Sequence, residues 1–122
     1  MKTKSTLIIL ILTCISFFVN AQLAGNTFQL DMGEQGKFNL KFNEKTYELL
    51  TSTGEQLVIG DYTVEKDMVS FIDKGGLQAC QPGTVGKYKF NVEKGQMVLE
   101  LVEDDCEGRP SMAAGVWKQI EN

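Results

Sequence analysis

The stretch GKYKFNVEKGQMVLEL, residues 86–101, alternates apolar and polar side chains on both sides of the dipeptide Lys94-Gly95. Such alternation is typical of strands that bury one face. Facing residues of an antiparallel pair lie on the same side of a sheet, which makes Lys94-Gly95 a two-residue turn with a positive φ at the glycine. Three facing pairs are therefore predicted: Val92 with Met97, Phe90 with Leu99, and Tyr88 with Leu101.

The same alternation predicts three further hairpins upstream, with turns at Glu44-Lys45, Thr53-Gly54 and Lys66-Asp67. The first and third turns lack the glycine or asparagine that two-residue turns favour, so a longer loop is the alternative there. The predicted facing pairs are Phe38 with Thr51, Leu40 with Leu49, Phe42 with Tyr47, Leu49 with Val58, Tyr47 with Gly60, Tyr62 with Phe71, and Val64 with Val69.

Two further segments, residues 26–32 and 115–121, bring the number of short strands to eight. A long connection is the Gly- and Pro-containing segment 74–84, and no segment has the period of 3.6 that crossover helices need. We therefore predict an all-β fold, an eight-stranded antiparallel up-and-down meander barrel, with a two-layer β-sandwich as the alternative. Residues 22–122 form a single domain in this interpretation.

The first 21 residues have the pattern of a secretory signal peptide. Lys2 and Lys4 precede an apolar run that ends at Val19, and this run is shorter than the about 20 residues that cross a bilayer. We expect cleavage after Ala21 and a periplasmic or extracellular protein without a transmembrane segment in its mature chain. A lipoprotein anchored through Cys14 is the alternative.

The chain is acidic, with a formal net charge of −4, and it contains no histidine. An acidic surface disfavours nucleic-acid binding, and the lack of histidine excludes Ser-His and Cys-His catalysis. The acidic run 103–107 has the oxygen ligands that Ca²⁺ prefers, but it lacks the spaced pattern of a calcium loop. We expect no enzyme activity, no cofactor and no metal site.

Cys80 and Cys106 are the two cysteines of the expected mature chain. An even count in a small exported domain favours a disulfide. The hairpin register, extended outwards, places Cys106 opposite Gly83, close to Cys80. We therefore predict a structural disulfide across the open end of this hairpin, with a redox-active pair as the alternative.

The predicted inward face is rich in aromatic side chains, which form either a filled core or the lining of a ligand cavity. Short strands with many rings favour a filled core. If a cavity exists, the ligand-binding residues are Tyr47, Tyr62, Phe71, Tyr88 and Phe90. The other inward residues are Phe38, Phe42, Leu40, Leu49, Val58, Val64, Val69, Val92, Met97, Leu99 and Leu101.

Four apolar residues, Leu50, Leu57, Ile59 and Ile72, project outwards in the predicted register. An exposed apolar patch of this kind is typical of a surface for a protein partner or a homodimer. A covering terminal segment is the alternative, and it would leave the patch without a function.

The order of these features resembles small secreted lipocalin-like (calycin) domains of bacteria, many of which have no assigned function. The resemblance spans residues 60–118. It is carried by Gly60-x-Tyr62-x-Val64, Cys80, Gly86-x-Tyr88-x-Phe90, Leu99-x-Leu101, Asp104-x-Cys106-x-Gly108-Arg109 and Trp117. It implies an eight-stranded barrel that binds, without catalysis, a small hydrophobic ligand or a protein partner.

Lipocalins pair a tryptophan of the first strand with an arginine near the last strand. Here the first strand has no tryptophan, and Arg109 and Trp117 both lie near the C-terminus. We expect these two to stack and close one end of the barrel. The resemblance also implies an alternative function as a periplasmic protease inhibitor, in which residues 22–26 enter the active site of the protease.

Overall fold

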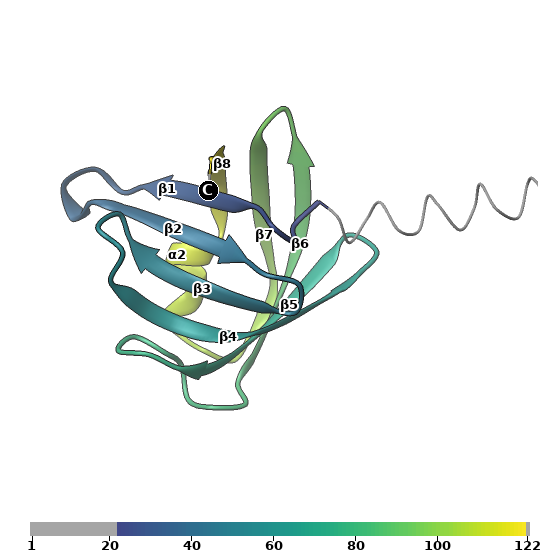
Figure 1. The fold of residues 1–122 in the computed structure, drawn as a ribbon. Helices are drawn as coiled ribbons and strands as arrows, with labels where there is room; N and C mark the ends of the chain where they lie inside the picture. Colours follow the sequence, from purple (N-terminus) through teal and green to yellow (C-terminus); the bar gives the residue numbers. More distant parts are fainter. Residues whose placement is uncertain (1–21, 122) are drawn as a thin grey trace, which may run out of the picture.

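The computed structural model describes residues 22–121, and the expected signal peptide and Cys14 lie outside this range. The strands follow one another around a barrel in the order of the sequence (Figure 1). They are β1 (Thr27–Asp31), β2 (Lys37–Phe42), β3 (Thr46–Thr51), β4 (Gln56–Glu65), β5 (Met68–Gly75), β6 (Val85–Glu93), β7 (Gln96–Asp104) and β8 (Gly115–Ile120).

The barrel closes through antiparallel pairing of β1 with β8, in which Phe28 faces Gln119. The predicted eight-stranded meander barrel is therefore confirmed, and the two-layer sandwich is excluded. Two short helical elements were not predicted: a 3₁₀ turn, Gly33–Gln35, between β1 and β2, and α2, Arg109–Ala113, which precedes β8. No helix within residues 22–121 is both long enough and apolar enough to span a membrane.

The predicted register is confirmed for every facing pair of the four hairpins. The turns at Glu44-Lys45, Lys66-Asp67 and Lys94-Gly95 contain two residues each, as the flanking pairs show. Lys94 and Gly95 both have positive φ, 53° and 76°, which matches the twist of the flanking strands.

The two-residue turn predicted at Thr53-Gly54 is wrong, and so is the outward position of Leu57. Gly54 adopts a φ of 96°, and Leu50 pairs with Gln56 while Leu49 pairs with Val58. Leu57 is thus the extra residue of a β-bulge, which interrupts the alternation of β4. As a result both Leu57 and its neighbour Val58 are buried in the core.

The burial expected for Leu101 is wrong: this residue faces Tyr88 as predicted but is 49% exposed. The pairing of β7 with β8 ends at Leu99 and Gly115, so Leu101 lies beyond the cover that β8 supplies. Directly after Leu101 the register against β6 shifts, and Val102 is the extra residue there. The other predicted inward residues are buried or pack partly buried against the core.

Candidate functional site

A cavity of about 370 Å³ lies between the inner faces of the strands and two covering segments, the loop 76–84 and α2. Its lining is mainly apolar and includes Leu40, Leu49, Val58, Phe71, Met112 and Trp117. The cavity has the size and character of a site for one small ligand. The barrel is therefore neither fully filled nor fully hollow: aromatic side chains pack part of the interior, and space remains beside α2.

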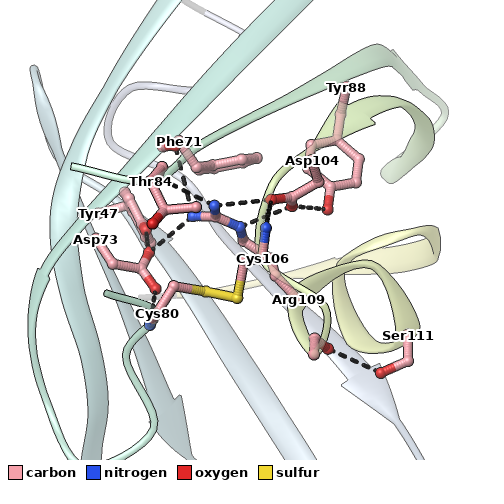
Figure 2. Close-up of polar contacts among 11 residues, drawn as sticks. Tyr47, Phe71, Asp73, Cys80, Thr84, Tyr88, Asp104, Cys106, Arg109 and Ser111 are labelled. Carbon is pink, nitrogen blue, oxygen red and sulfur yellow. Dashed lines mark hydrogen bonds and ion pairs between the residues drawn. A yellow bond between two sulfur atoms is a disulfide. The ribbon is translucent and has the colours of Figure 1, made fainter. Parts of the chain in front are cut away.

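Arg109 lies at the edge of this cavity between two carboxylates, Asp73 and Asp104 (Figure 2). Its Nε donates to Asp104 Oδ2 at 2.8 Å, and its Nη2 donates to Asp104 Oδ1 at 2.9 Å. Its Nη1 donates to Asp73 Oδ1 at 3.1 Å. The three side chains are 10% exposed or less, so they form a buried ion triad with one positive and two negative charges.

The remaining donors of Arg109 are bound by main-chain oxygens. Nη1 donates to the carbonyl of Phe71 at 3.5 Å, and Nη2 donates to the carbonyl of Thr84 at 3.1 Å. A guanidinium has five N–H groups, and all five of Arg109 now have an acceptor. Arg109 therefore joins β5, the loop before β6 and the end of β7.

Two tyrosines complete the triad. The Tyr47 hydroxyl donates to Asp73, and the Tyr88 hydroxyl donates to Asp104. Burial is the largest cause of a raised pKa for both phenols, and the neighbouring carboxylate raises each pKa further. Both hydroxyls therefore remain protonated donors across the physiological pH range.

The charges of the triad stabilise one another. Burial disfavours the ionised form of Asp104, but the hydrogen bonds from Arg109, Tyr88 and the Cys106 N–H outweigh burial and lower the pKa of this carboxyl. Burial also acts against the Arg109 cation, whereas Asp104 and Asp73 raise its pKa above the usual value. Asp104 and Arg109 therefore both stay ionised, which a buried site permits only when each charge is paired.

Local sequence explains how the strands place these groups. Asp73 continues the inward series Val69, Phe71 of β5. The register shift in β7 brings Asp104 opposite Gly86 on β6. A Cβ at Gly86 would approach Asp104 Oδ2 to 2.4 Å, so the carboxylate occupies the space that this glycine leaves.

The disulfide between Cys80 and Cys106 is present, as predicted. Both cysteines line the cavity, and the bond joins its covering loop to the segment that leads into α2 (Figure 2). The backbone N–H groups beside the bond bind the triad: Cys80 donates to Asp73 Oδ2 at 2.8 Å, and Cys106 donates to Asp104 Oδ1 at 2.9 Å. A disulfide of this kind is typical of an oxidising, extracytoplasmic compartment.

Of the five residues predicted to bind a ligand, Tyr47 and Phe71 line the cavity. Tyr62, Tyr88 and Phe90 are buried elsewhere in the core. The Tyr62 hydroxyl donates to the carbonyl of Asn43 at 2.6 Å, away from the triad.

Arg109 and Trp117 both line the cavity, and their polar groups have different partners, so the expected stack stays a prediction. The guanidinium is held by carboxylates and carbonyls, whereas the Trp117 indole N–H donates to the carbonyl of Ala113 at 2.9 Å. Arg109 therefore closes this end through an ion triad, and Trp117 anchors the end of α2.

Sequence reasoning missed Asp73 and Asp104 as partners of Arg109. The alternation Val69-x-Phe71-x-Asp73 contained a signal for the first, because it places a carboxylate on the inward face. Asp104 had no such signal, because the simple register places Glu103, not Asp104, opposite Gly86. In the acidic run 103–107, Asp104 binds Arg109, and the described residues contain no group of three or more possible metal ligands.

The predicted outward patch is divided in the structure. Leu57 belongs to the core, Leu50 and Ile72 are half-buried, and Ile59 is exposed. Other exposed apolar side chains lie on β7 and β8, where Val98 faces Val116, and in the loop 76–84, where Leu77 is exposed.

Comparison of the chain with protein-family models, curated proteins and solved structures finds no match. The site is therefore interpreted from its own geometry. The closed meander of eight strands is compatible with a lipocalin-like fold, and a barrel of this kind is compatible with binding.

Proposed function

We propose that the protein is an exported, lipocalin-like binding protein that holds one small, largely apolar molecule in the cavity beneath α2. The observation that carries this proposal is the cavity itself: about 370 Å³, mainly apolar, partly open to solvent, and lined on one side by a loop and a short helix. Ligand sites are typically clefts of about 300–1,000 Å³ with mainly apolar walls and a few polar groups, so a space of this size and lining favours a ligand.

Export is supported by two independent features. The disulfide joins Cys80 to Cys106, and such bonds persist in oxidising compartments. The first 21 residues have the charge and apolar pattern of a signal peptide. Both features support a periplasmic or extracellular location.

Binding without catalysis is supported by the chemistry of the triad. Every buried polar side-chain atom among the described residues has a hydrogen-bond partner. Asp73 and Asp104 are both paired with Arg109, which favours a structural role for these carboxylates over acid-base chemistry.

The alternative role as a protease inhibitor requires a free N-terminal segment. Leu23 is fully buried in the core, and the Gly25 N–H donates to the carbonyl of Phe42 at 2.9 Å. These contacts favour the ligand-binding role, because they hold the segment against the barrel.

A neutral fluorescent probe, N-phenyl-1-naphthylamine, tests the proposal. Its emission increases in apolar surroundings, so we expect saturable binding to the wild-type protein. Ala113→Leu fills part of the cavity and should weaken this binding. Ser111→Leu adds the same side chain to an exposed position of α2 outside the lining and should leave the affinity unchanged.

The thermal midpoint of each variant shows whether the barrel is intact. Native mass spectrometry of protein purified from its own host gives a second measurement, in which a bound small molecule is expected. Absence of saturable probe binding, or equal binding by Ala113→Leu in a folded barrel, would contradict the proposed function.

A further inference from the structure

The polar residues at the edge of the cavity determine which end group a bound ligand can carry. This inference rests on the proposed binding function. Two charged residues line the cavity, Asp73 and Arg109. Their unused hydrogen-bonding capacity therefore determines which polar end of an apolar molecule is accepted.

Arg109 has no donor left for a ligand. Its five N–H groups are bound by Asp73, Asp104 and the carbonyls of Phe71 and Thr84. An arginine at the edge of an apolar cavity would ordinarily be a partner for a carboxylate. Here an incoming carboxylate would have to displace Asp73 or Asp104 from the guanidinium.

Asp73, by contrast, has an acceptor position left. Its Oδ1 accepts from Tyr47 and Arg109, but its Oδ2 accepts only from the Cys80 N–H. A carboxylate oxygen accepts two hydrogen bonds. At the edge of the cavity, the protein can therefore still accept a hydrogen bond, and the ligand must donate it.

Charge favours the same end group. The triad has two carboxylates for one guanidinium, so its formal charge is negative, and it lies away from solvent screening. A negative end group would be repelled there and would also lose its hydration without gaining a hydrogen bond.

We infer that the cavity selects an apolar molecule whose polar end donates a hydrogen bond and carries no negative charge, with Asp73 as the acceptor. Alcohols and protonated amines belong to this class. Fatty acid anions do not.

Displacement of N-phenyl-1-naphthylamine by three compounds with the same alkyl chain tests the inference. The compounds are 1-octanol, octylamine and octanoate, and near neutral pH the amine is protonated whereas the acid is ionised. We expect octanol and octylamine to bind at least about tenfold more tightly than octanoate, which corresponds to about 1.4 kcal/mol. The chain's single tryptophan, Trp117, lines the cavity and reports binding independently through its own emission.

Heptyl methyl ether, which accepts but does not donate a hydrogen bond, separates donation from simple lack of charge. It should bind about threefold or more weakly than octanol, because it forms no hydrogen bond with Asp73. Ala113→Leu should weaken the binding of octylamine. This result would show that the amine binds in the cavity and is not merely attracted to the acidic surface of the protein.

Asp73→Asn links the selectivity to this residue, because it removes one negative charge beside Arg109. We expect the preference for octanol over octanoate to decrease in this variant. Asp105→Asn is the matched control: it removes the same charge from an exposed position close to the triad in sequence, and the preference should stay unchanged. If Asp73→Asn does not fold, the compound series with the wild-type protein still tests the inferred selectivity.

Octanoate binding as tightly as octanol, or the ether binding as tightly as octanol, would overturn the inferred selectivity and leave the proposed function intact. Failure of the naphthylamine and of all four alkyl compounds to bind would overturn both.

Discussion

Replacement of Arg109 by methionine is expected to destabilise the barrel far more than loss of an ordinary ion pair. Methionine keeps much of the length of the side chain but removes the charge and all five donors. Asp73 and Asp104, which are 3% and 0% exposed, would then remain in the interior without a cation.

Breaking a buried ion pair by removing one partner costs about 3–5 kcal/mol. A small domain has a total stability of about 5–15 kcal/mol, so the loss is a large share of the whole. The matched control is Lys74→Met, which breaks the ion pair of Lys74 with Asp61. The Nζ of Lys74 lies 2.7 Å from Oδ2 of Asp61, but the two side chains are 61% and 39% exposed. Because solvent screens this pair, its loss should cost about 1 kcal/mol or less.

The effect of Arg109→Met should depend on pH. In the wild-type protein the pKa of Asp104 is lowered, so its ionised form contributes stability above about pH 4, which is lost as the pH falls through the folded-state pKa. In the variant, burial of Asp104 remains but the cation is gone, so the folded-state pKa of this carboxyl should be higher than in the wild-type protein. The variant should then lose less stability than the wild type as the pH falls, and the difference between the two proteins should shrink.

Urea denaturation of both variants, followed by the emission of the buried Trp117, measures these free energies. The comparison is made near pH 7 and at about pH 3.5, on either side of the usual carboxyl pKa. Destabilisation by Arg109→Met no larger than that by Lys74→Met, or of equal size at both pH values, would refute the role assigned to the triad.

Three further outcomes are expected. Reduction of the Cys80–Cys106 disulfide, which closes a loop with a sequence separation of 26, should cost about 3.5 kcal/mol and lower the thermal midpoint by more than about 10 °C. Two reactive thiols in freshly purified, non-reduced protein would contradict the bond. Gly60→Ala places a Cβ at 2.3 Å from the Ile72 carbonyl oxygen and should destabilise by about 1–3 kcal/mol, whereas Gly108→Ala meets no atom within 4 Å and should be neutral in urea denaturation. Burial raises the pKa of all three tyrosines, so the protein should lose stability as the pH rises above about 10. Phenolate absorbance should appear only when the protein unfolds. A phenolate in the folded protein near pH 10 would contradict this prediction.

Hairpin pairing could be predicted from the sequence, because it depends on contacts between residues close in the chain. The alternation around Lys94-Gly95 predicts the pairs Phe90 with Leu99 and Val92 with Met97, and both are present. Cys80 and Cys106 could be paired by extending this register. A strand has a period of two, so each identified pair specifies the face of every neighbour until a bulge intervenes.

The bulges mark the point at which this reasoning fails. Leu57 and Val102 are extra residues in their strands, and each one reverses the faces of the residues that follow it. The alternation of apolar residues does not show where an extra residue enters. Only the structure therefore places Leu57 in the core and turns Asp104 towards Arg109.

The sequence by itself determined the eight strands, their order and their hairpin register, because these follow from local alternation and turn chemistry. Only the tertiary structure decided the site. Arg109 meets Asp73 across 36 positions of the chain, through the closure of the barrel and the docking of α2. The cavity beside them is the space left between strands, loop and helix, and its shape depends on how those elements pack, which no residue pattern within a single hairpin encodes.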